Sequence, residues 1–178
     1  MFPAFLRSRW WDTPTPLYRA LVCTEAGPWT SLCLEEDWEY DCRIAATGVS
    51  LYYVPEYVCE VRDHDCQRLC RGESKDPHRM QDRAEAHKLI FQHAQQAGIT
   101  PDIPEMQHFA RELFLLCRQC GAAGLQDEAE MLFELAREAS GTQRGKGMDF
   151  ILYGLLARLF GWVNAGKLAC LADRVRKG

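Results

Sequence analysis

The residues after Pro77 repeat apolar side chains at the spacing of an amphipathic helix, and this pattern limits the fold more than any other feature. The clearest stretch is 105–121, where apolar residues recur at i, i+3, i+4 and i+7 and therefore share one helix face. Its predicted buried stripe is Met106, Phe109, Ala110, Leu113, Leu116, Cys117 and Cys120. The same spacing predicts further helices over 80–97, 126–139, 148–162 and 165–176.

Two of these helices are joined by the short run "GAAG" (121–124), which predicts an antiparallel helical hairpin. The A-x3-F element of tetratricopeptide repeats occurs at Ala129 and Phe133. The tryptophan and proline of that pattern are missing, and no second copy follows, whereas repeat arrays need about three units to bury a core. An ordinary helical hairpin is therefore favoured over a repeat.

The part before Pro77 predicts a different structure. Two runs, Ala20–Cys23 and Ser50–Val61, are rich in β-branched and aromatic residues and predict strands. Pro55 splits the second run, which indicates an edge position or a bulge. Between them, the stretch from Leu34 predicts a helix that ends at Gly48.

A polar stretch closed by proline, "RGESKDP" (71–77), marks the predicted boundary between two domains, 1–77 and 78–178. The expected fold class is α+β, with an α/β region followed by an all-helical C-terminal extension.

Composition and charge exclude several classes of protein. A net charge of −4 gives no reason to expect a nucleic-acid partner. The nine cysteines are odd in number and irregularly spaced, and the N-terminus lacks the features of a signal peptide. We therefore expect reduced thiols and a cytoplasmic protein. No run reaches the ~18 apolar residues of a membrane span.

The acidic run Glu35-Glu36-Asp37 has two interpretations. Acids favour the first turn of a helix because its exposed N–H groups carry partial positive charge, which stabilises each acid by ~0.3–1 kcal/mol. Alternatively, a carboxylate fixed at a helix start could act as a general base toward an alcohol, with Trp38 as a wall of the site. The later loop "RDHD" (62–65) offers a cation, an imidazole and two carboxylates, a set that could meet a metal ion or a diphosphate.

Five elements in order resemble the second half of a family 2 glycosyltransferase catalytic domain, over roughly residues 10–66. That family has an arginine and G-x-[FW] segment, an E-D-x-[ED] motif, an arginine and glycine on the same helix, a V-P strand and an R/H loop. The matching residues are Arg19, Gly27, Trp29, Glu36-Asp37-Trp38-Glu39, Arg43, Gly48, Val54-Pro55, Arg62 and His64.

The resemblance implies a nucleotide-sugar transferase fold of the GT-A type and an inverting transfer to a glycan or lipid-linked acceptor. It implies Asp37 as the base with Glu36 beside it, and Trp38, Arg19 and Arg62 on the substrate. It also implies a divalent cation, Mg²⁺ or Mn²⁺, for which His64 is the candidate ligand. Trp11, paired with Trp10, could stack on a sugar ring or simply pack against the fold.

The donor-binding half of that family has no counterpart here, so the resemblance implies a shortened or split enzyme. The missing half could be a separate chain, and the isolated chain is then expected to be inactive. The alternative function is a non-catalytic helical interaction module that binds a partner protein. An Asp37→Asn variant distinguishes the two, because it should abolish turnover in an enzyme and change little in a binding module.

Three further patterns have both a structural and a functional interpretation. Cys117 and Cys120 form a CxxC that could bind zinc with Cys66 and Cys70, but both also fall on an apolar stripe. The histidines of the helical half share no ligand spacing and are expected on helix surfaces. The apolar run 148–163, followed by basic residues, suits either a buried helix or contact with the inner face of a membrane through 148–178.

Overall fold

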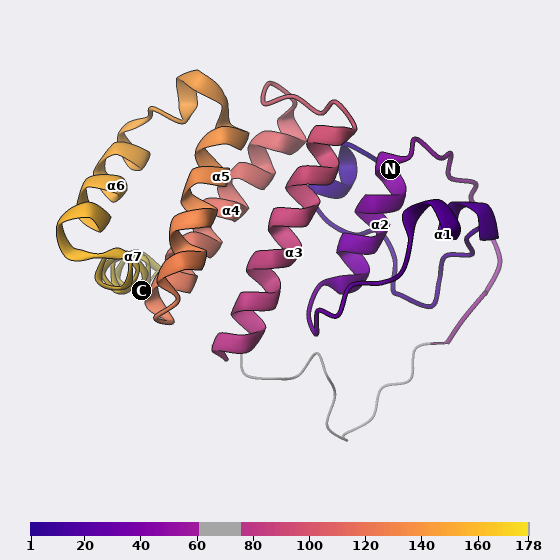
Figure 1. Cartoon of the computed structure of the whole chain (residues 1–178), viewed down its shortest axis with the longest axis horizontal. Helices are drawn as coiled ribbons and strands as arrows, with labels where there is room; N and C mark the ends of the chain where they lie inside the picture. The colour runs from indigo at the N-terminus through magenta and orange to yellow at the C-terminus, as the bar shows by residue number, and fades with distance from the viewer. Residues whose placement is uncertain (61–75, 178) are drawn as a thin grey trace.

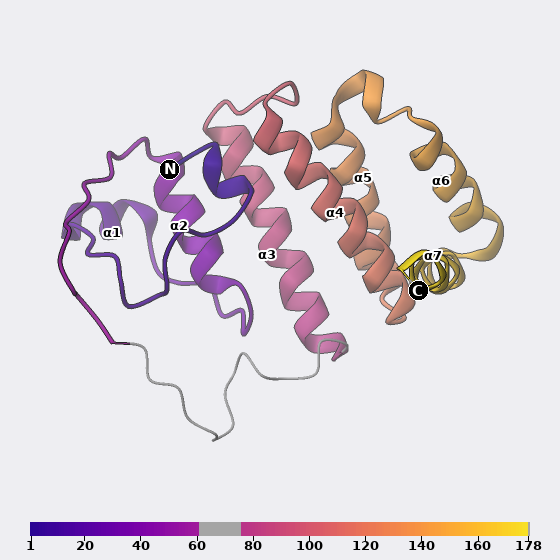
Figure 2. The same cartoon turned by 180° about the vertical axis from the view of Figure 1, so that it is seen from behind.

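The computed structural model describes residues 1–60 and 76–177, and every regular element within them is a helix. Figure 1 shows a row of helices with α1 and α2 at one end and α6 and α7 at the other, and Figure 2 shows the same row from behind. The elements are η1 (Ala4–Leu6), α1 (Ala20–Ala26), α2 (Glu36–Ala46), α3 (Pro77–Gln96), α4 (Pro104–Ala122), α5 (Gln126–Arg144), α6 (Met148–Phe160) and α7 (Trp162–Lys177).

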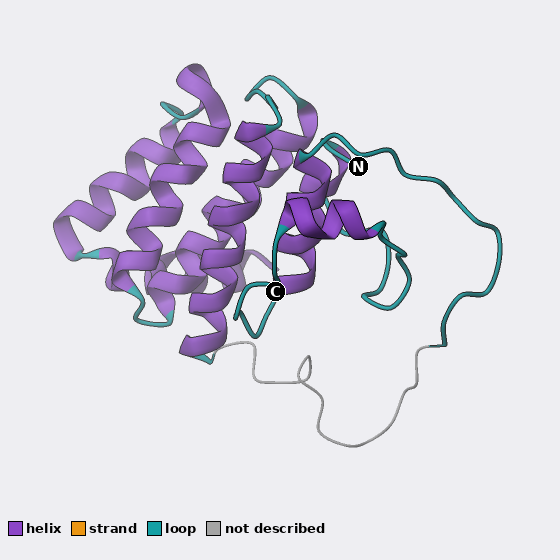
Figure 3. Cartoon of the chain, turned by 45° about the vertical axis from the view of Figure 1, so that its right-hand side comes forward, coloured by secondary structure: helices purple, strands orange, loops and turns teal. Residues whose placement is uncertain are grey.

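The predicted α+β fold is wrong, and the resemblance to a glycosyltransferase of the GT-A type is contradicted with it. The first predicted strand, 20–23, lies inside helix α1, and 50–60 has no regular structure. Residue 61 lies outside the described residues. Figure 3 shows helix and loop throughout the described chain and no strand. A β-prone run becomes a strand only where a neighbour completes its hydrogen bonds, and the described residues supply none.

The helices predicted after Pro77 are confirmed, with boundaries displaced by a few residues. Their starts follow local chemistry: the Asp76 side chain accepts a hydrogen bond from the His78 backbone N–H at 3.0 Å, and Pro77 takes the first helical position. Pro104 likewise takes the first helical position of α4. The helix predicted from Leu34 is α2.

None of the helices in the described residues combines the length and apolarity needed to cross a membrane.

Helix α4 lies at the centre of the core, where it packs against α5, α7, α3 and η1. All seven residues of its predicted stripe are buried. Five apolar residues of α5 are buried as well: Ala129, Leu132, Phe133, Ala136 and Ala139. The turn between α4 and α5 needs Gly124, which has φ +90, and it is closed by the Leu125 N–H donating to the Cys120 carbonyl at 2.9 Å. The predicted antiparallel hairpin is therefore present.

The N-terminal residues share this core. Phe5 and Leu6 are fully buried in the same cluster as α4, together with Cys42 and Ala45 of α2. The indole N–H of Trp38 donates to the Phe5 carbonyl at 2.9 Å, which ties α2 to η1. Side chains from before and after the predicted domain boundary thus pack together.

Helices α4 and α7 cross at two glycines. A Cβ atom on Gly166 would lie 2.4 Å from the Ala122 backbone nitrogen, and one on Gly121 would lie 2.6 Å from the Trp162 carbonyl oxygen. Because the obstructing atoms belong to the backbone, no rotamer change could relieve the contact. The two helices can approach this closely only because both residues lack side chains.

We predict that Gly166→Ala lowers the free energy of unfolding by ~1–3 kcal/mol, the usual cost of overpacking, despite the ~1 kcal/mol that alanine gains over glycine in a helix. Urea unfolding followed by circular dichroism measures it. Gly154→Ala in α6 is the matched control, because its Cβ would meet only the edge of the Phe133 ring, at 3.2 Å. Equal stability of the two variants would show that the crossing tolerates a side chain.

Candidate functional site

Asp37, the predicted general base, lies in the first turn of α2 with both carboxylate oxygens occupied. Its Oδ2 accepts hydrogen bonds from Arg9 Nη1 at 2.5 Å and from Thr13 Oγ1 at 2.6 Å. Its Oδ1 accepts from the Trp38 backbone N–H at 2.7 Å. These contacts hold the segment before α1 against α2. The geometry is that of an anchor.

Asp41, one turn further along α2, is the buried counterpart of this anchor. Its Oδ2 accepts from Arg9 Nε at 2.6 Å and from the Trp11 indole N–H at 2.9 Å, and its Oδ1 accepts from the Tyr18 hydroxyl. Burial, together with this hydrogen bond to Asp41, raises the pKa of Tyr18. Arg9 therefore bridges two carboxylates of one helix face, and four residues fasten the N-terminal segment to α2: Arg9, Trp11, Thr13 and Tyr18.

Glu39 is almost completely buried, and it points to the opposite side of α2. Arg43 donates to both of its oxygens, at 3.0 Å and 2.8 Å, and His93 Nε2 of α3 lies 2.8 Å from Oε1. Burial alone would raise the pKa of Glu39, but the hydrogen bonds from His93 and Arg43 outweigh it and hold that pKa below its ordinary value. This carboxylate therefore joins α2 to α3 in its ionised form.

Glu35 completes the set at the start of α2. It forms an ion pair with Arg83 Nε at 2.8 Å, and His87 Nδ1 lies 3.0 Å from its other carboxylate oxygen; both partners are on α3. His87 is buried, and its ring stacks on Phe109 at 5.4 Å between centroids. The prediction that the histidines of α3 lie on its surface is wrong for His87 and His93, because both turn toward the acids of α2.

The other predicted site residues have the following places in the described part of the chain. Trp38 packs edge-on to His87 and Phe109, Trp11 packs edge-on to Phe5, and both lie only partly exposed in the fold. Arg19 is exposed at the N-cap of α1, and Glu36 is half-buried on the first turn of α2. Arg62 and His64 lie outside the described residues.

No group of three or more His, Cys, Asp or Glu suited to a metal ion occurs in the parts of the chain that the structure describes. Cys117 and Cys120 are buried on the α4 stripe, and burial raises the pKa of each thiol to about 12. They pack as small apolar residues. Cys66 and Cys70, the other members of the suggested zinc site, lie outside the described residues.

Sequence reasoning missed Arg9, Tyr18, Arg83 and the pairing of His93. Arg9 and Asp41 are 32 residues apart, and no helical or strand periodicity links them. The only signal was the spacing within α2, where Glu35, Asp37, Glu39 and Asp41 alternate along the chain. That alternation sends two carboxylates toward the N-terminal segment and two toward α3.

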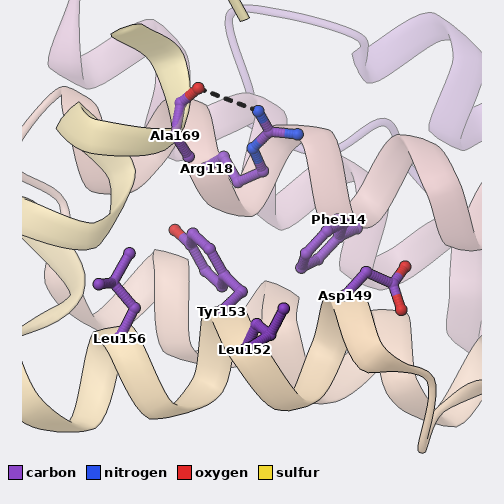
Figure 4. A pocket seen from close by; sticks show the side chains of 7 residues that line it. All are labelled: Phe114, Arg118, Asp149, Leu152, Tyr153, Leu156 and Ala169. Atoms are coloured by element: carbon purple, nitrogen blue, oxygen red, sulfur yellow. Dashed lines mark hydrogen bonds between the residues drawn. The ribbon is translucent and has the colours of Figure 1, made fainter. Parts of the chain in front are cut away.

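A cavity of about 400 Å³ opens between α4, α6 and α7, as Figure 4 shows. Its walls are mainly apolar, and Arg118 at its edge bonds the Ala169 carbonyl and Asp173 of α7. Tyr153 is buried here. Burial, followed by the Cys117 thiol beside it, raises the pKa of Tyr153. The cavity therefore suits an apolar group.

The outward side of α6 carries a row of exposed apolar side chains, which we term the α6 stripe: Met148, Ile151, Leu152, Leu155 and Leu159. Each is between 46% and 74% exposed, while Phe150, Tyr153 and Ala157 on the other side of the helix are buried. Leu152 belongs to the stripe and also lines the cavity. An apolar row of this kind usually marks an interaction surface.

A scan of protein-family models, a search of curated proteins and a search of solved structures find nothing that matches the chain.

We predict that Asp41→Asn lowers the free energy of unfolding by ~3 kcal/mol, because it leaves Arg9 facing a neutral buried amide. Asp37→Asn, at a more exposed position, should cost only ~1 kcal/mol. Urea unfolding of the two variants measures the difference. If Asp37→Asn proved the more damaging change, the anchor would have been assigned to the wrong carboxylate.

Glu39 makes stability depend on pH. Because its folded pKa lies below its ordinary value of 4.5, its contribution is complete above about pH 4.5 and is lost as the pH falls through the folded pKa. The difference in unfolding free energy between the wild type and Glu39→Gln should therefore shrink at acid pH. Glu130→Gln, on the exposed side of α5, is the control. A difference that grew as the pH fell would contradict the assignment.

Proposed function

We propose that the chain is a non-catalytic helical interaction module, and that its partner is a second copy of the same chain docked through the α6 stripe. The observation that supports this is the distribution of apolar residues on α6, which cover both of its sides. One side fills the core through Phe150 and Tyr153, and the other faces solvent. The helix lies at one end of the row in Figures 1 and 2, where no further helix of the described chain covers it.

The stripe is complementary to itself. In an antiparallel pair of identical helices related by a two-fold axis, residues equally far from the axis lie opposite each other. With the axis between Tyr153 and Gly154, Met148 faces Leu159 of the second copy, and Leu152 faces its Leu155. Both contacts are apolar, so these parts of the stripe are complementary to themselves, as a two-fold interface requires.

The charges of α6 favour a protein partner over an anionic membrane. Asp149 and Arg158 are the only charged residues of this helix, so its net charge is zero. Interfacial membrane helices combine an apolar side with several Lys or Arg residues. Arg144 and Lys146 precede the helix, and Lys167 and Arg174 lie on α7.

The apolar area of the stripe gives an order-of-magnitude value for the affinity of the dimer. Burying the exposed half of a leucine-sized side chain is worth about 1 kcal/mol, so five residues from each copy contribute about 10 kcal/mol before association costs. Association takes an estimated ~4–15 kcal/mol. At most about 6 kcal/mol remains, so we expect a weak dimer with a dissociation constant of about tens of micromolar or more.

Sedimentation equilibrium across about 1–200 µM protein should show a monomer–dimer equilibrium for the wild type. The double variant Leu152→Glu/Leu155→Glu should be monomeric over the same range, because two carboxylates would face each other at the centre of the interface. Circular dichroism checks that the variant keeps its helices.

Leu21→Glu is the control, because Leu21 is also an exposed leucine, at 83%, but lies on α1 at the other end of the row. It should dimerise like the wild type. A wild type that is monomeric throughout, or a dimer that survives the double substitution, contradicts the proposal. Flotation with anionic vesicles that depends on Leu152 and Leu155, without dimerisation, would assign the stripe to a membrane instead.

A further inference from the structure

A second cavity, of about 540 Å³, lies between α3, α4 and α7, on a different side of α7 from the cavity of Figure 4. It follows from the glycine crossing. Gly121 and Gly166 bring the backbones of α4 and α7 into contact. The residues after Gly121 are two alanines, whose short side chains leave space beside the end of α4. Met80 of α3 also lines the space, so Met80 and Ala122 give one side of the cavity an aliphatic surface.

One face of α7 supplies the opposite wall. Lys167, Cys170, Leu171 and Arg174 follow at i, i+3, i+4 and i+7, the spacing that puts side chains on one side of a helix, and all four line the cavity. Two of them are cations placed two turns apart along the same edge.

The charges that face this cavity are all positive. Arg83 of α3 also lines it, and none of the lining residues is acidic. Arg83 is already paired with Glu35. Lys167 and Arg174, in contrast, form no ion pair with any residue in 1–60 or 76–177, so two positive charges border an aliphatic cavity without a counter-ion.

We propose that this cavity binds an anion carried on an aliphatic chain, such as an alkyl phosphate monoester. The volume is within the range of ~300–1,000 Å³ typical of small-ligand sites. Lys167 and Arg174 meet the charged group, which Arg can bind through two parallel N–H donors, and the alkyl chain covers Met80, Ala122 and Leu171. Because no aromatic ring lines the cavity, the body of the ligand is aliphatic. This site is independent of the proposed dimer.

Isothermal titration calorimetry of the full chain with octyl phosphate tests the proposal. We expect saturable binding, and a loss of about tenfold or more in affinity for Lys167→Glu and for Arg174→Glu, because each reverses a charge at the rim. Lys146→Glu, an exposed lysine outside the cavity, is the matched control and should bind like the wild type. Should a reversal disturb the fold, Lys167→Gln and Arg174→Gln replace it.

Two further ligands measure the contributions of the charged group and of the alkyl chain separately. Octanol lacks the charge and inorganic phosphate lacks the chain, so both should bind at least about tenfold more weakly than octyl phosphate. Equal binding of either one, binding unchanged in the charge variants, or no binding of octyl phosphate overturns the proposal. Vesicles containing phosphatidic acid identify the source: co-sedimentation that requires Lys167 and Arg174 assigns a lipid headgroup, and its absence assigns a soluble ester.

Discussion

The packing of α4 against its neighbours is the constraint on which the rest of the structure depends. Its apolar stripe is long enough to contact α3 and η1 on one side and α5 on the other, and its last turn reaches α7 through glycine. Interiors are packed so tightly that a single added methyl group is felt. The close approach at Gly121 therefore fixes where α7 lies, and through α7 it fixes which side of α6 stays exposed.

The N-terminal segment is held in a different way. Apart from Phe5 and Leu6, it contributes few fully buried apolar side chains, and it is fastened to α2 by Arg9, Trp11 and Tyr18. A buried ion pair adds little net stability over a well-packed apolar contact, but losing one partner is costly. These contacts therefore specify the path of the segment more than they raise the overall stability. Two acids of α2, Asp37 and Asp41, have that role.

The sequence predicted the helical half well because its signal is local. The stripe of α4 is read from residues three and four apart, and a helix forms all of its backbone hydrogen bonds within itself. Strand formation is not local, since 50–60 has the residue types of a strand but no neighbour to pair with. The pairs Arg9–Asp41 and Glu39–His93 join distant segments. The order and spacing of residues in a motif do not reveal such contacts. The family resemblance rested on order and spacing alone, and it therefore predicted the wrong fold.

Helices α6 and α7 have opposite chemistry on their free sides, and the glycine crossing accounts for both. At the crossing, α7 passes over the end of α4. The cationic face of α7 then lies opposite the small residues at that end, and a cavity remains between them. The same crossing leaves α6 supported from one side only. A helix at the end of a row usually has a polar outer face, which keeps the protein soluble. The outer face of α6 is apolar instead. A second α6 would cover that face without any change to the fold, while the α7 cavity would stay open to its ligand.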